Sequence, residues 1–317
     1  MIGRFAPSPT GRMHLGNVYS ALLSWLSAKS QGGGWLLRIE DLDPQRSRRV
    51  YAEQLEDDLR WLGLTWDAGG IEDPQYVQSN RSGIYEAHLA TLQAKGLTYP
   101  CYCSRADILA TQAPHESDGR VVYQGTCRPD GTETKAEWLK ARALACPHAP
   151  AIRIQVPDCD ICFTDLHYGP QQFNLAKECG DFILRRADGA WAYQLAVVVD
   201  DLLMGVSEVV RGRDLLSSVP QQLFLYETLG YKAPDFCHLP LLCNESGQRL
   251  CKRDQSLHMG TLREHFSAEE IIGKLACFAH LTDRQEAISA QELISLFDWH
   301  KVPTADLRIS PDAIFNN

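Results

Sequence analysis

The first hundred residues alternate between two patterns of apolar positions. A short apolar run, Ile2–Phe5, opens the chain, and a second follows in the segment GWLLRIEDLDP, which ends in acidic residues. Leucines then recur at a helical spacing, at Leu55, Leu59 and Leu62. The runs predict buried strands, and the spacing predicts an amphipathic helix. Because strand, helix, strand, helix is the order that builds a parallel sheet, we expect an α/β fold.

Further helices and strands are predicted between and beyond these segments. A Pro-containing loop leads to a helix over about residues 17–29, and a second helical pattern covers 81–95 before Gly96, a residue suited to a helix end. The periodicity fades over about 101–127. Strands return in DFILRRADG and SEVVRG, and a helix over 223–229 follows them.

The composition of the 317-residue chain, 44% hydrophobic and 22% charged, is that of a folded protein with a substantial core. This length predicts two packed units or one large α/β unit. The best apolar run, Leu195–Val199, is far shorter than the ~18 residues of a membrane span. It stops at Asp200 and Asp201, and this pair can either hold magnesium or cap a turn.

The predicted cell compartment and the net charge limit the possible classes of function further. The polar N-terminus lacks a secretory signal, so we expect a cytoplasmic protein whose eleven cysteines are thiols or metal ligands. The net charge of −9 argues against a surface that wraps nucleic acid as a whole. A local basic face, such as Arg46, Arg48 and Arg49, remains compatible with RNA, since fields are screened within ~10 Å.

The segment RFAPSPTGRMHLGN joins the first predicted strand to the first predicted helix. Its His14 and Gly16 suit a nucleotide site. The imidazole can donate a ring N–H to a phosphate, the glycine lets a flat base approach the backbone, and the helix N-terminus favours the anion. Alternatively, His14 caps the helix and Gly16 makes a turn, which is the better interpretation of an isolated H-x-G pattern.

The longer string decides between these interpretations. It resembles the HIGH signature of the class I aminoacyl-tRNA synthetases, and FAPSPTG is similar to the form found in the glutamate and glutamine branch. The resemblance implies a Rossmann-type parallel-sheet catalytic domain in which His14 is catalytic. It also implies that ATP is a substrate and that Mg²⁺ accompanies it. The residues expected to bind ATP are His14, Gly16, Asn17 and Lys252 of a lysine loop.

That lysine loop, the KMSKS signature of the family, is identified as Arg249-Leu250-Cys251-Lys252-Arg253. Lys252 matches the second lysine and is expected to be catalytic. Its ammonium would neutralise charge that develops on the β- and γ-phosphates as pyrophosphate leaves. Arg249 replaces the first lysine, keeping the charge with a different geometry, and Cys251 replaces the serine. Without the first signature, this segment would be interpreted as a solvated basic turn.

A glutamate pocket needs a cation for the side-chain carboxylate, an anion or acceptor for the α-amino group, and small groups that allow close approach. The resemblance assigns glutamate binding to Arg4, Ala6, Ser8, Glu40, Tyr193 and Arg211. Glu40 would hold the ammonium, and Arg4 or Arg211 would hold a carboxylate. Taken alone, Glu40 fits an acidic turn, Tyr193 a core aromatic, and Arg211 a surface ion pair at a strand end.

Three cysteines and a tyrosine occur in the irregular segment as C-x-C and Y-x-x-x-C. Zinc favours four such ligands in a closed tetrahedral site, although buried free thiols are also common. The arrangement resembles the zinc insertion of glutamyl-type synthetases, which implies a structural Zn²⁺ on Cys101, Cys103, Tyr123 and Cys127. A rival C-x-x-C pair in PDCDIC is interpreted as ordinary thiols.

The resemblance covers nearly the whole chain and divides it into four parts. These are the first half of the catalytic domain, the zinc-containing insertion, the second half with the lysine loop, and a short helical extension, at 1–97, 98–178, 179–257 and 258–317. Because the chain ends 65 residues after Lys252, we expect no anticodon-binding domain. This is the pattern of the glutamyl-Q tRNA(Asp) synthetases.

That family activates L-glutamate with ATP to glutamyl-adenylate and transfers the glutamate to queuosine at the wobble position of tRNA(Asp). The resemblance implies the same reaction here, with adenylate formation that does not need tRNA, and we expect a monomer without a membrane partner. Unpaired anticodon bases can be splayed out and bound, which makes such an acceptor physically reasonable.

Three alternatives remain open at this point. The first is a truncated glutamyl-tRNA synthetase that charges the 3′ end of tRNA(Glu). The second is a small-metabolite nucleotidyltransferase with a similar phosphate loop. The third is a zinc-stabilised RNA-binding module whose nucleotide site has decayed.

Overall fold

Two groups of short parallel strands form the centre of the fold. The computed structural model describes residues 1–104, 106–107, 122–250 and 257–315. In it, β1 (Ile2–Phe5) pairs with β2 (Gly34–Leu37), and β2 pairs with β3 (Ala68–Gly69). β9 (Glu208–Gly212) pairs with β10 (Asp235–Leu239). All these pairs are parallel, as predicted, because helical crossovers return the chain to the same end of the sheet.

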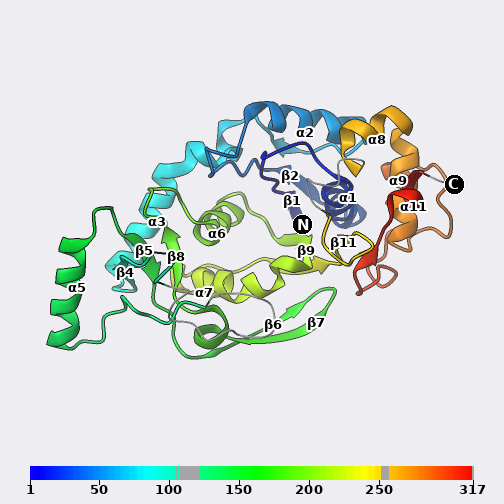
Figure 1. The fold of residues 1–317 in the computed structure, drawn as a ribbon. Coiled ribbons are helices and arrows are strands. Elements are labelled where there is room, and N and C mark those ends of the chain that lie inside the picture. Colours follow the sequence, from blue (N-terminus) through cyan, green and yellow to red (C-terminus); the bar gives the residue numbers. More distant parts are fainter. Residues whose placement is uncertain (105, 108–121, 251–256, 316–317) are drawn as a thin grey trace.

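β9 lies along β1 and joins the two groups (Figure 1). The Ser207 N–H donates to the Ile2 carbonyl at 2.9 Å, and the Ile2 N–H donates to Ser207 Oγ at 2.9 Å. The Arg4 guanidinium donates to the Val210 carbonyl at 3.2 Å. Segments that are 205 positions apart therefore build one core.

The helices of the first half follow the predicted apolar spacing. α1 (Leu15–Ser30) connects β1 to β2 and contacts β1 and β9. In α2 (Arg49–Trp61), the two leucines Leu55 and Leu59 are buried. α3 (Ser82–Ala94) buries Tyr85, Leu89 and Leu92, and Gly96 follows with a left-handed φ of 69°. The glycine thus ends the helix as predicted, since it adopts this conformation without steric cost.

Two helices of the second half differ from the sequence prediction. α6 (Tyr193–Leu203) was not predicted, because residues 195–201 are all buried and the helix therefore lacks the polar face that periodicity detects. α7 (Val219–Leu229) begins four residues before the predicted start. Pro220 lies in its first turn, where a missing N–H costs nothing.

The middle of the chain forms a separate antiparallel sheet. β5 (Ala151–Ile154) pairs with β4 (Thr98–Cys101) on one side and with β8 (Phe182–Arg185) on the other. β6 (Asp160–Asp165) and β7 (Gly169–Asn174) form a hairpin. The sheet includes β8, so it continues past residue 178, where sequence analysis placed the end of the insertion.

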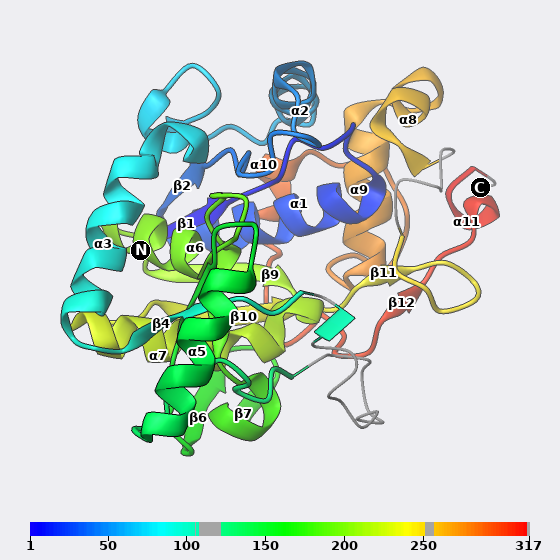
Figure 2. The ribbon, with the colours of Figure 1, turned by 60° about the vertical axis from the view of Figure 1, so that its left-hand side comes forward.

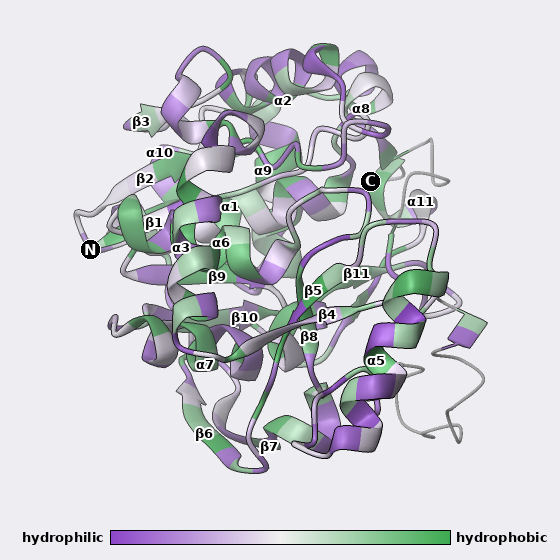
Figure 3. Cartoon of the chain, turned by 90° about the vertical axis from the view of Figure 1, so that its left-hand side faces the viewer, coloured by the Kyte–Doolittle hydropathy of each residue, from purple (hydrophilic) through white to green (hydrophobic). Residues whose placement is uncertain are grey.

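α5 (Glu133–Ala145) projects from this middle part at the periphery of the molecule and has no buried residue (Figure 1). Much of the helix is hydrophilic (Figure 3). Its Thr132 N-cap accepts a hydrogen bond from the Lys135 N–H at 3.2 Å. Its contacts with the rest of the protein are few, and among them the partly buried Leu139 packs against the small cluster around Cys101.

The C-terminal part is mostly helical in short pieces, as predicted. It contains α8 (Met259–His265), α9 (Ala268–Phe278), α10 (Ala290–Leu293) and α11 (Pro311–Phe315). β12 (Leu307–Arg308) pairs in parallel with β11 (Leu242–Cys243). Figure 2 shows α9 beside α1, and residues of both helices belong to one apolar cluster. No helix within the described ranges is long and apolar enough to cross a membrane.

Candidate active site

A cavity of about 420 Å³ lies where the loops after β1 and β2 meet the first turn of α6 and the end of β9. These are the carboxyl ends of parallel strands, where open α/β sheets bind ligands. The cavity is lined by most of the residues predicted for the nucleotide and glutamate sites, namely Arg4, Ala6, Ser8, His14, Asn17, Glu40, Tyr193 and Arg211. The fold thus brings together residues from four separate segments.

Two predicted residues stand apart from this set. Gly16 does not line the cavity, but a Cβ at its position would lie 3.1 Å from the His14 ring, so the glycine makes room for the imidazole. Lys252 lies outside the described residues. On its N-terminal side, Arg249 lines the cavity and is ion-paired with Asp214.

His14 is the N-cap residue of α1. Its Nδ1 accepts a hydrogen bond from the Gly16 N–H at 3.2 Å, and Asn17 Oδ1 accepts one from the His14 N–H at 3.1 Å. Because Nδ1 is an acceptor, a neutral imidazole carries its proton on Nε2 and donates from that atom. The capping and phosphate-binding interpretations are therefore compatible, since each uses a different ring nitrogen.

The chain on the far side of the predicted lysine loop returns to the same place. His258 forms an antiparallel bridge with His14. Arg12 lies just before His14, and its guanidinium is 3.0 Å from Oδ1 of the buried Asp58. Arg263, in α8, is 2.8 Å from the same oxygen. This shared carboxylate ties the loop that carries His14 to the segment that follows the lysine loop.

A buried arginine behind the cavity, Arg38, was missed by sequence analysis. Its side chain has no solvent exposure, and its guanidinium lies 2.6 Å from Asp201 Oδ1 and 3.0 Å from Glu40 Oε1. Arg4 also contacts Asp201, at 3.3 Å. The only signal in the sequence is an arginine two residues before Glu40 at the end of a strand, because the partner acid is 163 positions away.

Asp200 and Asp201 accept hydrogen bonds from side chains of the protein itself. Asp200 accepts hydrogen bonds of 2.6–2.9 Å from three buried side chains, those of Arg81, Gln78 and Tyr85. Burial alone would raise the pKa of Asp201, but the Arg38 and Arg4 guanidinium groups lower it below its ordinary value. The pair therefore holds arginines in place, a role that sequence analysis did not consider.

Arg211, at the end of β9, is surrounded by neutral partners. Its Nε donates to His238 Nε2 at 3.1 Å, its Nη1 to Tyr193 Oη at 3.3 Å, and its Nη2 to Gln222 Oε1 at 2.9 Å. In the part of the chain that the structure describes, no carboxylate hydrogen-bonds or ion-pairs with it. Burial lowers the pKa of Arg211, because a buried cation without a carboxylate in direct contact is unfavourable, although the more distant Asp201 acts in the opposite direction.

The same cavity is lined by a carboxylate, that of Glu40, whose side chain is 9% exposed. Burial raises the pKa of Glu40, while Arg38 and Arg4 act to lower it. Burial also raises the pKa of Tyr193, which keeps its phenol protonated. A carboxylate and an unneutralised guanidinium on the walls of one cavity suit a ligand that carries both an ammonium and a carboxylate group.

One group of described residues places its ligand atoms close enough for a metal ion, with sulfurs all within 4.8 Å of one another, namely Cys101, Cys103 and Cys127. Tyr123 Oη lies 3.4 Å from Cys101 Sγ and 3.7 Å from Cys103 Sγ. A hydrogen bond from Cys127, aided by one from Tyr123, lowers the pKa of Cys101 to about 4. Thiolate character in a cluster of three sulfurs and a phenol fits a metal site.

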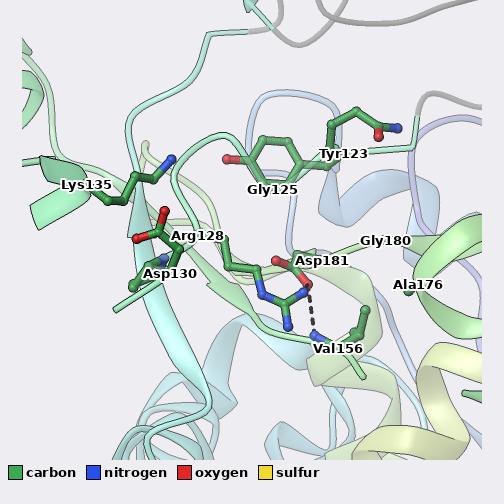
Figure 4. Close-up of a pocket in the computed structure, with 11 residues that line it drawn as sticks. Tyr123, Gly125, Arg128, Asp130, Lys135, Val156, Ala176, Gly180 and Asp181 are labelled. Atoms are coloured by element: carbon green, nitrogen blue, oxygen red, sulfur yellow. Dashed lines mark hydrogen bonds and ion pairs between the residues drawn. The ribbon is translucent and has the colours of Figure 1, made fainter. Parts of the chain in front are cut away.

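A second cavity, of about 500 Å³, shares Tyr123 with this group of residues (Figure 4). Tyr123 lines it, together with Arg128 and Asp181. Asp181 Oδ1 accepts a hydrogen bond from the Val156 N–H at 2.9 Å and lies 3.3 Å from Arg128 Nη1, so the two charges neutralise each other. None of the residues predicted for nucleotide or glutamate lines this cavity. The 420 Å³ cavity is therefore the candidate active site.

Comparisons with known proteins show which family this chain belongs to. The family described as tRNA synthetases class I (E and Q), catalytic domain, matches residues 1–308. A glutamyl-Q tRNA(Asp) synthetase of Symbiobacterium thermophilum is 48% identical, over 99% of this chain and 97% of the relative. One of Nitratidesulfovibrio vulgaris is 44% identical, over 98% and 96%. A glutamate tRNA ligase from Elizabethkingia meningosepticum, crystallised in complex with its amino acid, superposes with a TM-score of 0.81 at 31% identity, covering 99% of this chain and 68% of that chain.

Proposed function

Because this chain belongs to the class I tRNA synthetases of the glutamate and glutamine branch, among the glutamyl-Q tRNA(Asp) synthetases, we propose that it modifies tRNA(Asp). It activates L-glutamate with ATP and transfers the glutamyl group to queuosine at the wobble position. The family supports ATP and Mg²⁺ as the nucleotide substrate and its counterion. We expect the enzyme to work as a cytoplasmic monomer.

One observation carries this proposal. The buried guanidinium of Arg211 and the partly buried carboxylate of Glu40 line the same cavity as His14, which follows the loop after β1. Glutamate presents an ammonium and two carboxylates, so a carboxylate can neutralise Arg211 while the ammonium joins the ion pair that Glu40 forms with Arg38. ATP bound at the start of α1 would lie next to it, because helix N-termini favour phosphate groups.

The structure also supports a particular assignment of binding roles to the pocket residues. Arg4 is already paired with Asp201 at 3.3 Å, whereas Arg211 has only neutral partners. We therefore infer that Arg211 supplies the main charge for a glutamate carboxylate and that Glu40 receives the ammonium. The Tyr193 hydroxyl, which accepts a hydrogen bond from Arg211, donates to the same carboxylate, and Ala6 and Ser8 leave room for the ligand.

The activation step forms one bond and breaks another. An oxygen of the glutamate α-carboxylate attacks the α-phosphorus of ATP, and the bond from that phosphorus to the bridging oxygen of pyrophosphate breaks. Pyrophosphate leaves with the electron pair, and the product is the mixed anhydride glutamyl-adenylate. His14 and Lys252 would stabilise the phosphate oxygens, where negative charge grows in the transition state.

The transfer step uses this anhydride. A hydroxyl oxygen of queuosine attacks the glutamyl carbonyl carbon, the bond from that carbon to the phosphate oxygen breaks, and AMP leaves with the electron pair. The hydroxyl proton is released to solvent. An anticodon loop is a suitable acceptor, because its bases are unpaired and can be splayed into a cavity.

The cysteine group fits a structural zinc site, which we propose to be formed by Cys101, Cys103, Tyr123 and Cys127. When bound, Zn²⁺ would cross-link the end of β4 to residues 123–127. The apolar cluster around these residues is small, so a metal can contribute stability that a core does not.

The domain division is also retained as a proposal. We propose that 1–97 and 179–257 form the catalytic domain, that 98–178 are an insertion, and that 258–317 are a helical extension. The antiparallel pair of β4 and β5 and the hairpin of β6 and β7 support a distinct middle unit, while β8, beyond residue 178, links this unit to the second half of the catalytic domain.

The proposed activation is tested by exchange of labelled pyrophosphate into ATP without tRNA. We expect exchange that depends on L-glutamate. Exchange with another carboxylic acid and none with glutamate would favour the metabolite nucleotidyltransferase. A complete absence of exchange by folded enzyme would favour the non-catalytic RNA-binding module.

The acceptor is tested separately. Labelled glutamate is transferred to tRNA(Asp) that carries queuosine, the tRNA is cleaved, and the label is located. We expect it on the anticodon fragment. Label at the 3′ end of tRNA(Glu), sensitive to mild base and blocked by periodate treatment of that end, would instead identify a truncated glutamyl-tRNA synthetase.

A further inference from the structure

A chain of buried polar side chains leads from the middle sheet to the candidate active site. Asp165, the last residue of β6, lies at one end, His238 of β10 lies in the middle, and Arg211 of β9 lies at the other. Asp165 and His238 are both completely buried. Neither lines the cavity, so neither can touch a ligand there directly.

The hydrogen bonds among these three side chains determine the tautomer and the charge of the His238 imidazole. His238 Nε2 lies 3.1 Å from Arg211 Nε, and an arginine N–H can only donate, so Nε2 must be the acceptor. His238 Nδ1 lies 2.6 Å from Asp165 Oδ2 and therefore carries the proton. The imidazole is thus neutral, with its lone pair directed at Arg211.

Asp165 is held independently of the imidazole. Its Oδ1 accepts hydrogen bonds from the backbone N–H groups of His167 at 3.1 Å and Tyr168 at 2.9 Å. Its two oxygens also lie 3.2 Å from the His238 N–H. The carboxylate therefore fixes both the position and the tautomer of His238.

The result is a guanidinium that is oriented without being neutralised. Four of its N–H groups are accounted for by His238, Tyr193, Gln222 and the Leu215 carbonyl. A carboxylate in the place of His238 would hold Arg211 equally well, but it would cancel the charge that a substrate carboxylate needs. A neutral imidazole with a carboxylate behind it orients the arginine and keeps its charge available.

We propose that Asp165 and His238 are positioning residues that hold Arg211 for the carboxylate of glutamate and so set the affinity for the amino acid. The inference rests on the proposed function, because it takes glutamate as the ligand of Arg211. It also means that the β6–β7 hairpin, in the predicted insertion, supports the amino-acid site through Asp165.

Asp165→Asn is the most direct test. Its amide N–H₂ facing His238 would turn Nδ1 into an acceptor and move the proton to Nε2, where it opposes the Arg211 N–H. In glutamate-dependent pyrophosphate exchange, we expect the KM for glutamate to rise by about tenfold or more, because a buried hydrogen bond is replaced by two facing donors. The kcat should change by less than about threefold and the KM for ATP should stay the same, since uniform binding is lost.

A second pair of variants distinguishes positioning from packing. His238→Gln can keep an oxygen that accepts from Arg211, whereas His238→Leu cannot. We expect the glutamate KM of His238→Gln to lie between those of the wild type and His238→Leu. If the two variants have the same KM as the wild type, His238 does not position Arg211 and the proposal is overturned.

Tyr99→Phe is the matched control. It removes a hydrogen bond of 2.6 Å to Asp181, another buried aspartate of the middle part, away from the candidate active site. We expect a lower melting temperature and an unchanged KM for glutamate. An equal rise of KM in Tyr99→Phe and Asp165→Asn would show a general structural effect and overturn the proposal. If Asp165→Asn does not fold, the two His238 variants decide.

Failure of the proposed function has a different signature. A wild-type enzyme without glutamate-dependent exchange would refute glutamate activation itself. An active wild type whose folded Asp165→Asn variant keeps its KM would refute only the positioning role.

Discussion

Arg38 Nη1 lies 2.6 Å from Asp201 Oδ1 in a pair that is almost fully buried beneath the candidate active site. The same guanidinium contacts Glu40 at 3.0 Å. One arginine therefore supports a residue of the proposed pocket and a carboxylate of helix α6, in the second half of the chain. This contact makes the stability of the core and the geometry of the pocket depend on each other.

Arg38→Met is expected to destabilise the fold. The change leaves the carboxylates of Asp201 and Glu40 buried with less positive charge nearby, and removal of one partner from a buried ion pair costs about 3–5 kcal/mol. Urea unfolding measures this loss. Arg49→Met, which removes an exposed pair with Glu53, is the control and should have no measurable effect. A loss of less than ~1 kcal/mol for Arg38→Met would contradict the assigned role.

Lys252→Ala is expected to slow activation without weakening glutamate binding. Loss of one preorganised positive charge from the transition state should lower kcat of pyrophosphate exchange by about 100-fold. The KM for glutamate should stay within about threefold, since the lysine would contact ATP rather than the amino acid. Lys232→Ala, at an exposed position after α7, is the control. An unchanged kcat in Lys252→Ala would rule out the lysine loop assignment.

Cys101→Ser is expected to remove the metal and loosen the middle part of the chain. Metal analysis of freshly purified protein should find about one zinc ion per wild-type chain and much less in the variant, because a hydroxyl is a poor substitute for a thiolate ligand. Cys162→Ser, at an exposed position outside the cysteine group, should keep the metal. Folded wild-type protein without any bound metal would refute the site.

The buried His238 predicts a pH-dependent stability. Burial lowers the pKa of His238, although the hydrogen bond to Asp165 acts in the opposite direction; Arg211 and the more distant Arg4 also lower it. An unfolded chain binds a proton near pH 6.5 that the folded protein does not take up. The contribution of His238 to the free energy of unfolding should therefore be fully present above about pH 7. It should decrease as the pH is lowered further, by at most ~1.4 kcal/mol per pH unit.

Urea unfolding at pH 7.0 and at pH 5.5 measures this effect. His238→Gln should lose less stability between the two pH values than the wild type, because it lacks the titrating group. His300→Gln, at an exposed position, should behave like the wild type. Identical pH dependence in all three proteins would mean that His238 does not titrate as described.

Local signals were sufficient for much of the fold and for the candidate residues. The strand Ile2–Phe5 was predicted with the bounds that the structure has, and Gly96 and Gly230 end their helices with left-handed φ angles. A string such as FAPSPTGRMHLGN marks a site because backbone geometry and phosphate contacts require particular residues at a fixed spacing. Signals of this kind are short-range, so they can be read from one segment alone.

The tertiary structure decided which charges meet. Arg38 and Asp201 are 163 positions apart, and Asp165 reaches His238 across 73 positions. The helix α6 was invisible to periodicity because residues 195–201 are all buried and leave no exposed polar face. The amino-acid sequence by itself determined many of the elements and the residue types available for the chemistry. Only the folded chain determined that Arg4 is neutralised and Arg211 is not, because burial and pairing depend on neighbours that are distant in the sequence.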